Sequence, residues 1–227
     1  MADIAAQDVK ALRDATGAGM MDAKRALVDS DGDHEQAAQA LREKGLAKAA
    51  GRSDRDNTEG AIGLVATADR AALVHLRCET DFSAKSDGFV SLVDDLASAV
   101  LEEGETALEA RTAVLDDLRL STKENCEVSR VALVEAAAGN LVDTYLHCQD
   151  GRGVNGVVVE ASGVDQETLH QIALHIAFAK PTALSRDEVP ANLVEAERAA
   201  LLDITKAEGK PEQAWDKIVE GRLSAWF

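Results

Sequence analysis

Hydrophobic positions in the first fifty residues recur with the period of an α-helix. Three successive stretches show this spacing, and they contain Ile4, Val9 and Leu12, then residues 20–28, then Ala37, Ala38 and Leu41. Between the second and third stretches, residues 29–33 are rich in Asp and Gly, which predicts a turn with Asp33 as the N-cap of the third helix. Gly45 is expected to end that helix. We therefore predict a three-helix domain over residues 1–50.

Residues 51–60 contain two glycines and no large apolar side chain, which predicts a linker. The hydrophobic period changes after it. Two apolar, partly alternating runs at 61–66 and 71–78 are separated by four residues, a pattern that predicts a β-hairpin. Apolar residues at spacings of three and four then predict a helix over 87–103 and a further helical stretch over 108–120.

The downstream sequence repeats this order. It predicts strands over 131–137, 141–148 and 154–161, and a helix over 168–179. The first two of these strands flank Gly139 and Asn140, and we expect them to pair as a second hairpin. The shared order indicates an internal duplication, with a core of two halves, 61–125 and 126–189. Antiparallel half-sheets with helices on one side predict an α+β fold whose core is a two-part α/β sandwich.

The pattern changes once more at Pro190. Two helical stretches follow, and residues 208–211 interrupt them with the sequence EGKP. A Gly before a break and a Pro after it mark the end of one helix and the start of the next. Two helices joined by so short a turn are expected to fold back, so we predict an antiparallel helical hairpin over 190–227. Because its outer faces are charged, we expect the hairpin to project from the body.

The composition argues against several classes of function. The formal net charge is −17 and the pI is about 4.6, so the surface repels nucleic-acid phosphates and an anionic membrane leaflet. A protein or a cationic surface is the more natural partner, although acidity is also a common route to solubility alone. No stretch approaches the roughly 20 apolar residues of a membrane-spanning helix. The N-terminus carries an acid from its third residue and lacks the apolar segment of a signal peptide, which predicts a cytoplasmic location.

We predict no cofactor, no metal site and no covalent catalysis. Adjacent acids such as Asp94 and Asp95 point about 100° apart on a helix and do not converge on one substrate atom. His170 and His175 are five residues apart, which misses the helical metal-binding spacing. The cysteines lack a CxxC spacing and are expected as free thiols in a reducing compartment, each a small buried or half-buried hydrophobe: Cys78, Cys126 and Cys148. The alternative, an enzyme built around clustered acids, requires a concave site with a raised carboxylate pKa.

Two segments carry side chains that a small core does not explain. Met20 and Met21 begin a predicted helix, and two consecutive methionines cannot both face one small core. One of them is therefore expected at the surface, as part of a partner-binding face or as a stray exposed residue. The second segment is the polar loop after the first hairpin, which carries Phe82 between Asp81 and Lys85. This aromatic is either tucked into the core or a wedge for a partner's pocket.

The same two segments carry a family resemblance. The stretch LRDATGAGMMDAKRAL resembles the N-terminal signature of the elongation factor Ts family, and ETDFSAKSDGF resembles its second signature, TDFVAK. Three later stretches look like family counterparts: TYLH, which ends at His147, then AFAKP, then EGKPEQAWDKIVEGRL. The resemblance covers essentially the whole chain in the family's order.

The resemblance implies a guanine-nucleotide exchange factor for elongation factor Tu, recognising its GTPase domain in the GDP-bound and nucleotide-free forms, with no direct binding to nucleic acid or membrane. The three-helix start resembles a ubiquitin-associated-type (UBA-like) domain, with implied contact residues Arg13, Met20, Met21 and Lys24. Residues implied to intrude beside the partner's nucleotide site and dislodge its Mg²⁺ are Thr80, Asp81, Phe82 and Ser83. His147 is implied to contact Tu from the second half of the core, and the hairpin resembles the family's projecting coiled coil.

Three features depart from the family pattern. Ser83 stands where the family usually has an apolar residue, which is expected to weaken the packing of the intruding loop. Lys123 replaces a glycine in a family stretch that reads roughly IGENI; because lysine disfavours positive φ, we assign residues 122–126 no site. The chain ends at Phe227, whereas many family members continue with a further strand and a C-terminal module. A Tu-binding adaptor or storage protein without exchange activity is the alternative function, and a homodimer stays open.

Overall fold

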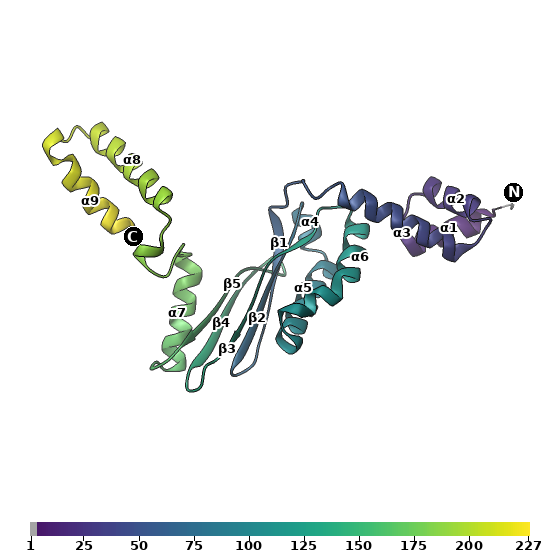
Figure 1. Cartoon of the computed structure of the whole chain (residues 1–227), viewed down its shortest axis with the longest axis horizontal. Helices are drawn as coiled ribbons and strands as arrows, with labels where there is room; N and C mark the ends of the chain where they lie inside the picture. The colour runs from purple at the N-terminus through teal and green to yellow at the C-terminus, as the bar shows by residue number, and fades with distance from the viewer. Residues whose placement is uncertain (1–3) are drawn as a thin grey trace. The chain divides into compact units, whose positions relative to one another are not determined.

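The computed structural model describes residues 4–227, so the first three residues of the predicted N-terminal domain lie outside the described part. The chain divides into two compact units, one ending at Phe178 and one spanning Ala179–Phe227. Helices and small antiparallel sheets build the first unit, and helices build the second (Figure 1). The predicted α+β class is confirmed at this level.

Three helices begin the first unit, as the hydrophobic pattern predicts. They are α1 (Ala6–Thr16), α2 (Met20–Asp29) and α3 (His34–Ala50). Asp33 caps α3, because its carboxylate accepts the backbone N–H groups of Glu35 and Gln36 at 2.9 and 3.0 Å. The helices enclose a small core of aliphatic side chains: Val9, Leu12, Ala23, Ala26, Leu27, Ala37 and Leu41.

The predicted end of the third helix at Gly45 is wrong. The helix continues to Ala50, and a Cβ at Gly45 would collide with the side chain of Leu120. This glycine therefore permits a close approach between α3 and a later helix, α6 (Thr112–Thr122), rather than a left-handed turn.

A three-stranded antiparallel sheet follows, with the order β1-β2-β3. Its strands are β1 (Glu59–Ala66), β2 (Arg70–Cys78) and β3 (Glu127–Glu135). One face is covered by α5 (Asp87–Glu103), whose Phe89 and Val93 are buried with Val74 and Leu76 of β2. The first predicted hairpin and the helix over 87–103 are confirmed.

Two segments differ in detail from what the hydrophobic pattern predicts. The stretch predicted as a helix over 108–120 divides into a 3-10 helix, η1 (Glu105–Arg111), and α6, which begins only at Thr112. Before β1, Asn57 is buried in the segment that the sequence marks as a linker, and its amide donates to Glu127 at 2.9 Å. This segment is therefore attached to the sheet.

The pairing predicted between residues 131–137 and 141–148 is wrong. β3 instead pairs with β2 and completes the first sheet. The second half contributes a separate two-stranded sheet of β4 (Leu141–Gln149) and β5 (Arg152–Ala161), followed by α7 (Gln166–Ala179). A hairpin followed by a helix does recur, but the second hairpin is formed by β4 and β5 and not by the strands at 131–137 and 141–148.

The turns explain this pairing. Asp150 and Gly151 have φ values of 53° and 78°, and two positive φ values are what a two-residue hairpin turn of matching twist requires. The segment around Asn140 instead crosses between the two sheets. The Glu160 carboxylate holds it by accepting from the Ala137 backbone N–H and the Asn140 amide at 2.8 and 2.7 Å.

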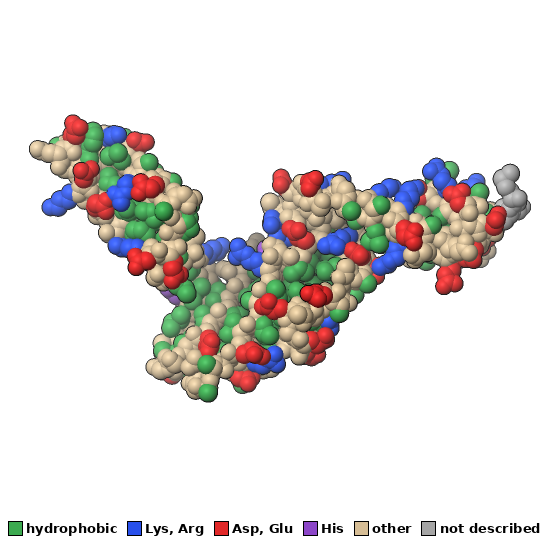
Figure 2. All heavy atoms as spheres, viewed as in Figure 1, with side chains coloured by type: hydrophobic (Ala, Val, Ile, Leu, Met, Phe, Trp, Pro, Cys, Tyr) green, Lys and Arg blue, Asp and Glu red, His purple; other side chains and the backbone are tan. Residues whose placement is uncertain are grey.

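The second unit is a pair of helices that fold back on each other. Its elements are η2 (Arg186–Glu188), α8 (Ala191–Ala207), η3 (Glu212–Ala214) and α9 (Trp215–Trp226). Thr205 of α8 is fully buried, and its hydroxyl accepts from Arg222 of α9 at 3.3 Å. Arg222 also pairs with Glu208 at 2.8 Å, and Val219 and Leu223 are buried beside it in α9. Figure 2 shows charged side chains on the visible face of this hairpin, with apolar ones among them.

Within residues 4–227, none of the helices combines the length and the apolar character that a membrane crossing requires.

Candidate functional site

The loop after β2 contains a single helical turn, α4 (Asp81–Ala84). Thr80 is its N-cap, since the Thr80 hydroxyl accepts the Ser83 backbone N–H at 3.3 Å. Ala84 is fully buried and anchors the turn on the core. Phe82 points the other way and is 83% exposed, the second most exposed of the four phenylalanines. The alternative that places Phe82 in the core is wrong.

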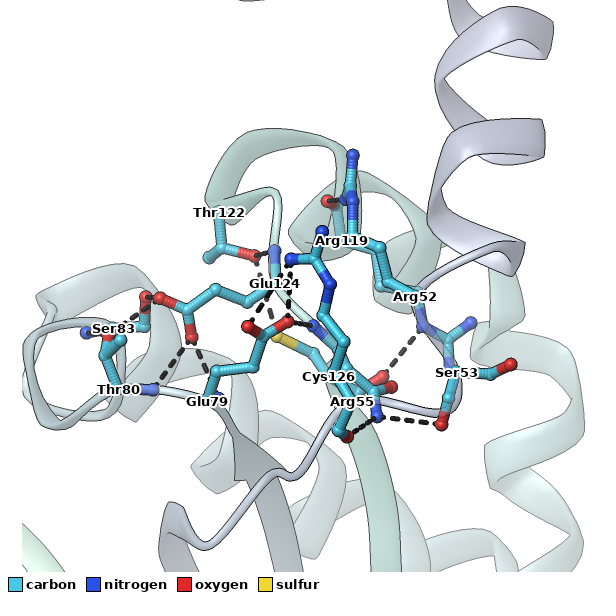
Figure 3. A network of polar contacts seen from close by, with 11 residues as sticks. Arg52, Ser53, Arg55, Glu79, Thr80, Ser83, Arg119, Thr122, Glu124 and Cys126 are labelled. Atoms are coloured by element: carbon cyan, nitrogen blue, oxygen red, sulfur yellow. Dashed lines mark hydrogen bonds and ion pairs between the residues drawn. The ribbon is translucent and has the colours of Figure 1, made fainter.

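One carboxylate holds this turn. The Oε2 atom of Glu124 accepts the backbone N–H groups of Glu79 and Thr80 at 3.0 and 3.1 Å. Its Oε1 atom accepts the hydroxyls of Thr80 and Ser83 at 2.7 and 2.6 Å. Figure 3 shows the Glu124 side chain reaching across to both hydroxyl residues. Where weaker packing was expected at Ser83, the structure shows that its hydroxyl makes a hydrogen bond that an apolar residue lacks.

The loop at Glu79 and the segment at Glu124 hold each other by hydrogen bonds in both directions. While Glu124 accepts from the backbone around Glu79, the Glu79 carboxylate accepts the backbone N–H of Asn125 at 2.6 Å. The Asn125 amide donates to the backbone carbonyls of Ser53 and Arg55 at 3.1 and 2.8 Å, so the segment before β1 also joins the network. We call the crossed contacts of Glu79 and Glu124 the carboxylate clasp.

The expectation for Lys123 is also wrong. Lys123 adopts the left-handed conformation, with φ 60° and ψ 26°, and ends α6 with its backbone N–H on the Arg119 carbonyl. The reversal directs the chain so that Glu124 meets the loop. Sequence reasoning assigned this segment no site and so missed Glu124. The available signal was the family stretch itself, whose glutamate this chain retains after the lysine.

Hydrogen bonding keeps the Glu124 carboxyl group ionised. Burial raises the pKa of Glu124, but hydrogen bonds from Ser83 and Thr80 and the nearby backbone N–H groups outweigh it, so the pKa lies below its usual value. The pKa of Asp81 is lowered chiefly by its hydrogen bond with Lys85. Both carboxyl groups are therefore charged at neutral pH.

Lys85 connects the turn to the second sheet. Its ammonium group lies 2.9 Å from Asp81 and 3.2 Å from Asp150, in the turn between β4 and β5. His147 lies three residues before Asp150 on β4, where it is exposed and its ring stacks on Tyr145. The fold thus ties the turn that follows His147 to the helical turn that carries Phe82.

The remaining candidate residues lie on the N-terminal helices. Met20 is 47% exposed and Met21 is 69% exposed, so both methionines, and not one, face solvent. Lys24 is exposed one turn further along α2, and the exposed Arg13 on α1 pairs with its neighbour Asp14 at 3.5 Å. The start of α2 thus presents two flexible thioethers to solvent.

The cysteines are free, but they divide into two kinds. Cys78 and Cys126 are buried as expected, and burial raises the pKa of Cys78 to about 12 and also raises that of Cys126. Neither is a ready thiolate at neutral pH. Cys148 is exposed, which corrects its expected burial, because the end of β4 lies at the surface.

The enzyme alternative requires a raised carboxylate pKa in a hollow. The pKa of Asp94 is raised by burial and by the neighbouring charge of Asp95. A hollow of about 160 Å³ in the described residues lies instead beside Arg152 and the edge of β1, and Asp94 is not among its lining residues. The raised pKa and the hollow therefore do not coincide.

Comparisons with known proteins agree on one family. A family model described as Elongation factor TS matches residues 79–227. A protein of Clavibacter michiganensis subsp. michiganensis named Elongation factor Ts is 45% identical over 100% of this chain and 86% of its own length. A namesake from Cutibacterium acnes is 44% identical, covering 99% of this chain and 85% of its own length. A third protein of this name, from Lactiplantibacillus plantarum, is 40% identical over 100% of this chain and 80% of its own length.

These matches group the chain with the elongation factors of protein biosynthesis. Within that class, it belongs to the elongation factor Ts family. The resemblance read from the two signature segments is thereby confirmed. The roles assigned to single residues stay predictions.

Proposed function

We propose that this chain is a guanine-nucleotide exchange factor for elongation factor Tu, acting on its GTPase domain in the GDP-bound and nucleotide-free forms. The observation that carries the proposal is Phe82, an exposed aromatic on a helical turn that Glu124 holds from behind. An apolar ring presented on a rigid support suits insertion into a partner better than it suits solvent.

The proposed mechanism is conformational. In a GTPase, Mg²⁺ bridges the phosphate oxygens and protein groups and neutralises concentrated charge. Insertion of the segment from Thr80 to Ser83, with Phe82 as the wedge, displaces groups that hold the ion, and the exposed phosphate repulsion weakens GDP. Binding of the factor and of GDP are then negatively coupled, and the coupling is reciprocal. Each tenfold loss of GDP affinity requires about 1.4 kcal/mol from binding of the factor.

The other contacts supply that binding free energy. We assign them to Arg13, Met20, Met21 and Lys24 on a UBA-like domain at residues 1–50, and to His147 on the second half of the core. The exposure of both methionines and of His147 supports this assignment.

The rest of the predicted organisation belongs to the same proposal. It comprises a linker at 51–60, core halves at 61–125 and 126–189, and a coiled-coil hairpin at 190–227. We propose action in the cytoplasm, where translation elongation takes place, with no cofactor and no direct contact with nucleic acid or membrane.

The decisive experiment measures the release of a fluorescent GDP analogue from elongation factor Tu with and without this chain. Marked acceleration at substoichiometric amounts of the chain supports catalytic exchange. Tight binding to Tu without acceleration contradicts the proposal and supports the adaptor or storage function. A size measurement of the isolated chain at several concentrations, by analytical ultracentrifugation, decides whether it forms a homodimer.

A further inference from the structure

We propose that Glu124 is the positioning residue of the exchange loop, holding Phe82 in the orientation that enters the partner before the partner arrives. The inference rests on the proposed exchange function and deepens it. Glu124 itself lies behind the turn and does not need to contact Tu.

The first argument is that α4 cannot order itself. A single turn of four residues has too few internal hydrogen bonds to offset the entropy of fixing its backbone. Its cap, Thr80, contributes one such bond from its hydroxyl to the Ser83 N–H. Two further restraints hold the ends of the segment: Glu79 accepts the Asn125 backbone N–H at 2.6 Å, and the Ser83 carbonyl accepts the Ser86 hydroxyl at 2.8 Å. The hydrogen bonds that reach from a distant part of the chain to the hydroxyls of Thr80 and Ser83, on either side of Phe82, both come from Glu124.

The second argument is the placement of the anchors around Phe82. Glu124 holds Thr80, two residues before the ring, through both its backbone N–H and its hydroxyl. It holds Ser83, one residue after the ring, through the hydroxyl at 2.6 Å. With fixed points on both sides, the backbone of Phe82 keeps its direction even though its ring contacts mostly solvent. A preformed loop avoids an ordering cost at the moment of insertion.

The third argument is chemical fit. All four groups around Glu124 are donors, two backbone N–H groups and two hydroxyls, and an ionised carboxylate is a pure acceptor with room for four. Glutamine has the same reach. Its oxygen can accept from the two N–H groups, and its NH₂ can donate to the two hydroxyls if they rotate. Alanine removes every bond. Glu124→Gln is therefore a rescue variant for Glu124→Ala.

The experiment compares these variants in stimulated GDP release as the concentration of the factor is raised, using full-length chain and Tu loaded with a fluorescent GDP analogue. For Glu124→Ala we expect the maximal rate to fall about tenfold, equivalent to about 1.4 kcal/mol, with a half-saturating concentration within about twofold of wild type. We expect Glu124→Gln to recover most of the rate. Glu109→Ala, at an exposed glutamate of η1, is the matched control and is expected to behave as wild type.

A fall in maximal rate at an unchanged half-saturating concentration indicates a positioning role. A general structural role would instead lower the melting temperature, lower the maximal rate and raise the half-saturating concentration. Amide hydrogen exchange gives a second readout that does not use Tu. In Glu124→Ala we expect Glu79, Thr80 and Ser83 to exchange at least about tenfold faster while Val74 and Leu76 of β2 stay protected. Equal loop protection in the variant and the wild type overturns the inference.

An unchanged maximal rate in Glu124→Ala also overturns it. If that variant fails to fold, Ser83→Ala tests the same idea by removing one anchor beside Phe82, with an expected loss in rate of about threefold. A wild-type chain that does not accelerate GDP release contradicts the proposed function instead. Hydrogen exchange still decides in that case whether Glu124 orders the loop.

Discussion

Two of the regions that present apolar side chains to solvent are built differently. Met20 and Met21 sit at the start of an ordinary surface helix, on long, unbranched side chains. Phe82 sits on a single turn that the carboxylate clasp and Lys85 restrain from several sides. One region offers adaptable side chains on a simple support, and the other offers a stiff ring on an elaborate one.

The two supports suit two different tasks, binding the partner and changing its structure. A methionine surface tolerates small misfits and adds contact area, which suits affinity. An aromatic ring that displaces groups in its partner needs a backbone that keeps its conformation during insertion. We therefore expect substitutions on α2 to change how much factor is needed, and substitutions around α4 to change how fast it acts once bound.

The largest effect is expected for Phe82→Ala. Loss of a buried hot-spot aromatic in the complex should lower the maximal stimulated rate by about 30-fold or more, corresponding to about 2 kcal/mol. The melting temperature should stay unchanged, since the ring is 83% exposed in the free chain. Stopped-flow GDP release and calorimetry measure the two quantities, with Val114→Ala, at an exposed residue of α6, as the control. A large drop in melting temperature would show that Phe82 supports the fold.

The next effect is expected for the double substitution Met20→Ala and Met21→Ala. It should weaken equilibrium binding to Tu about tenfold, because two flexible apolar contacts are lost, while the rate at saturating factor stays close to wild type. Arg13→Ala should act in the same direction. Titration calorimetry measures the affinity. Intact binding in both variants would remove α1 and α2 from the proposed contact and end the contrast with Phe82.

A smaller effect is expected from pH. The folded-state pKa of Glu124 is lowered from 4.5, so its contribution to stability is present above that value and is lost as pH falls through the folded pKa. Wild type should therefore be more stable than Glu124→Gln at neutral pH, by about 1 kcal/mol, and the difference should shrink below pH 4.5. Urea unfolding at a series of pH values tests this. A difference that is constant with pH would mean that charge on Glu124 does not matter for the loop.

The smallest effect is expected for Lys123→Gly. Lysine at φ 60° bears a steric cost that glycine avoids, partly offset by the greater freedom of glycine in the unfolded chain. We expect a gain in unfolding free energy of about 0.5 kcal/mol with the exchange rate unchanged. Urea unfolding measures the first and GDP release the second. A destabilised variant would mean that the lysine side chain makes a contribution of its own.

The fold could be predicted wherever local pattern decides it. The helix α5 ends at Glu103 as predicted, because Phe89, Val93 and Val100 set a clear helical period and Gly104 follows. The partner of β3 could not be predicted in this way, since strand pairing depends on tertiary contacts that an apolar run does not encode. The prediction that Gly45 ends a helix failed for a related reason. The same residue can end a helix or let another helix approach, and only the position of Leu120 distinguishes the two.

The site was predictable where a residue is unusual for its surroundings. Phe82 could be singled out from the polar loop around it, although its exposure stayed one of two alternatives until the structure decided it. Glu124 could not be singled out, because one glutamate among 41 acidic residues carries no mark of its own. Its partner Ser83 lies 41 positions away, and only the fold brings the two together.

The pairing of β3 with β2 has a consequence for how the chain is made. The strand that completes the first sheet ends at Glu135, well after the hairpin and helix on which it depends. Because a chain under synthesis emerges from its N-terminus, β1, β2 and α5 are made before the strand that completes their sheet, and such long-range pairing is slow. Glu124 reaches the loop on the same late segment, just before β3. During translation, the part of the chain that is proposed to act on another translation factor is therefore shaped only after Glu124 and β3 have been synthesised.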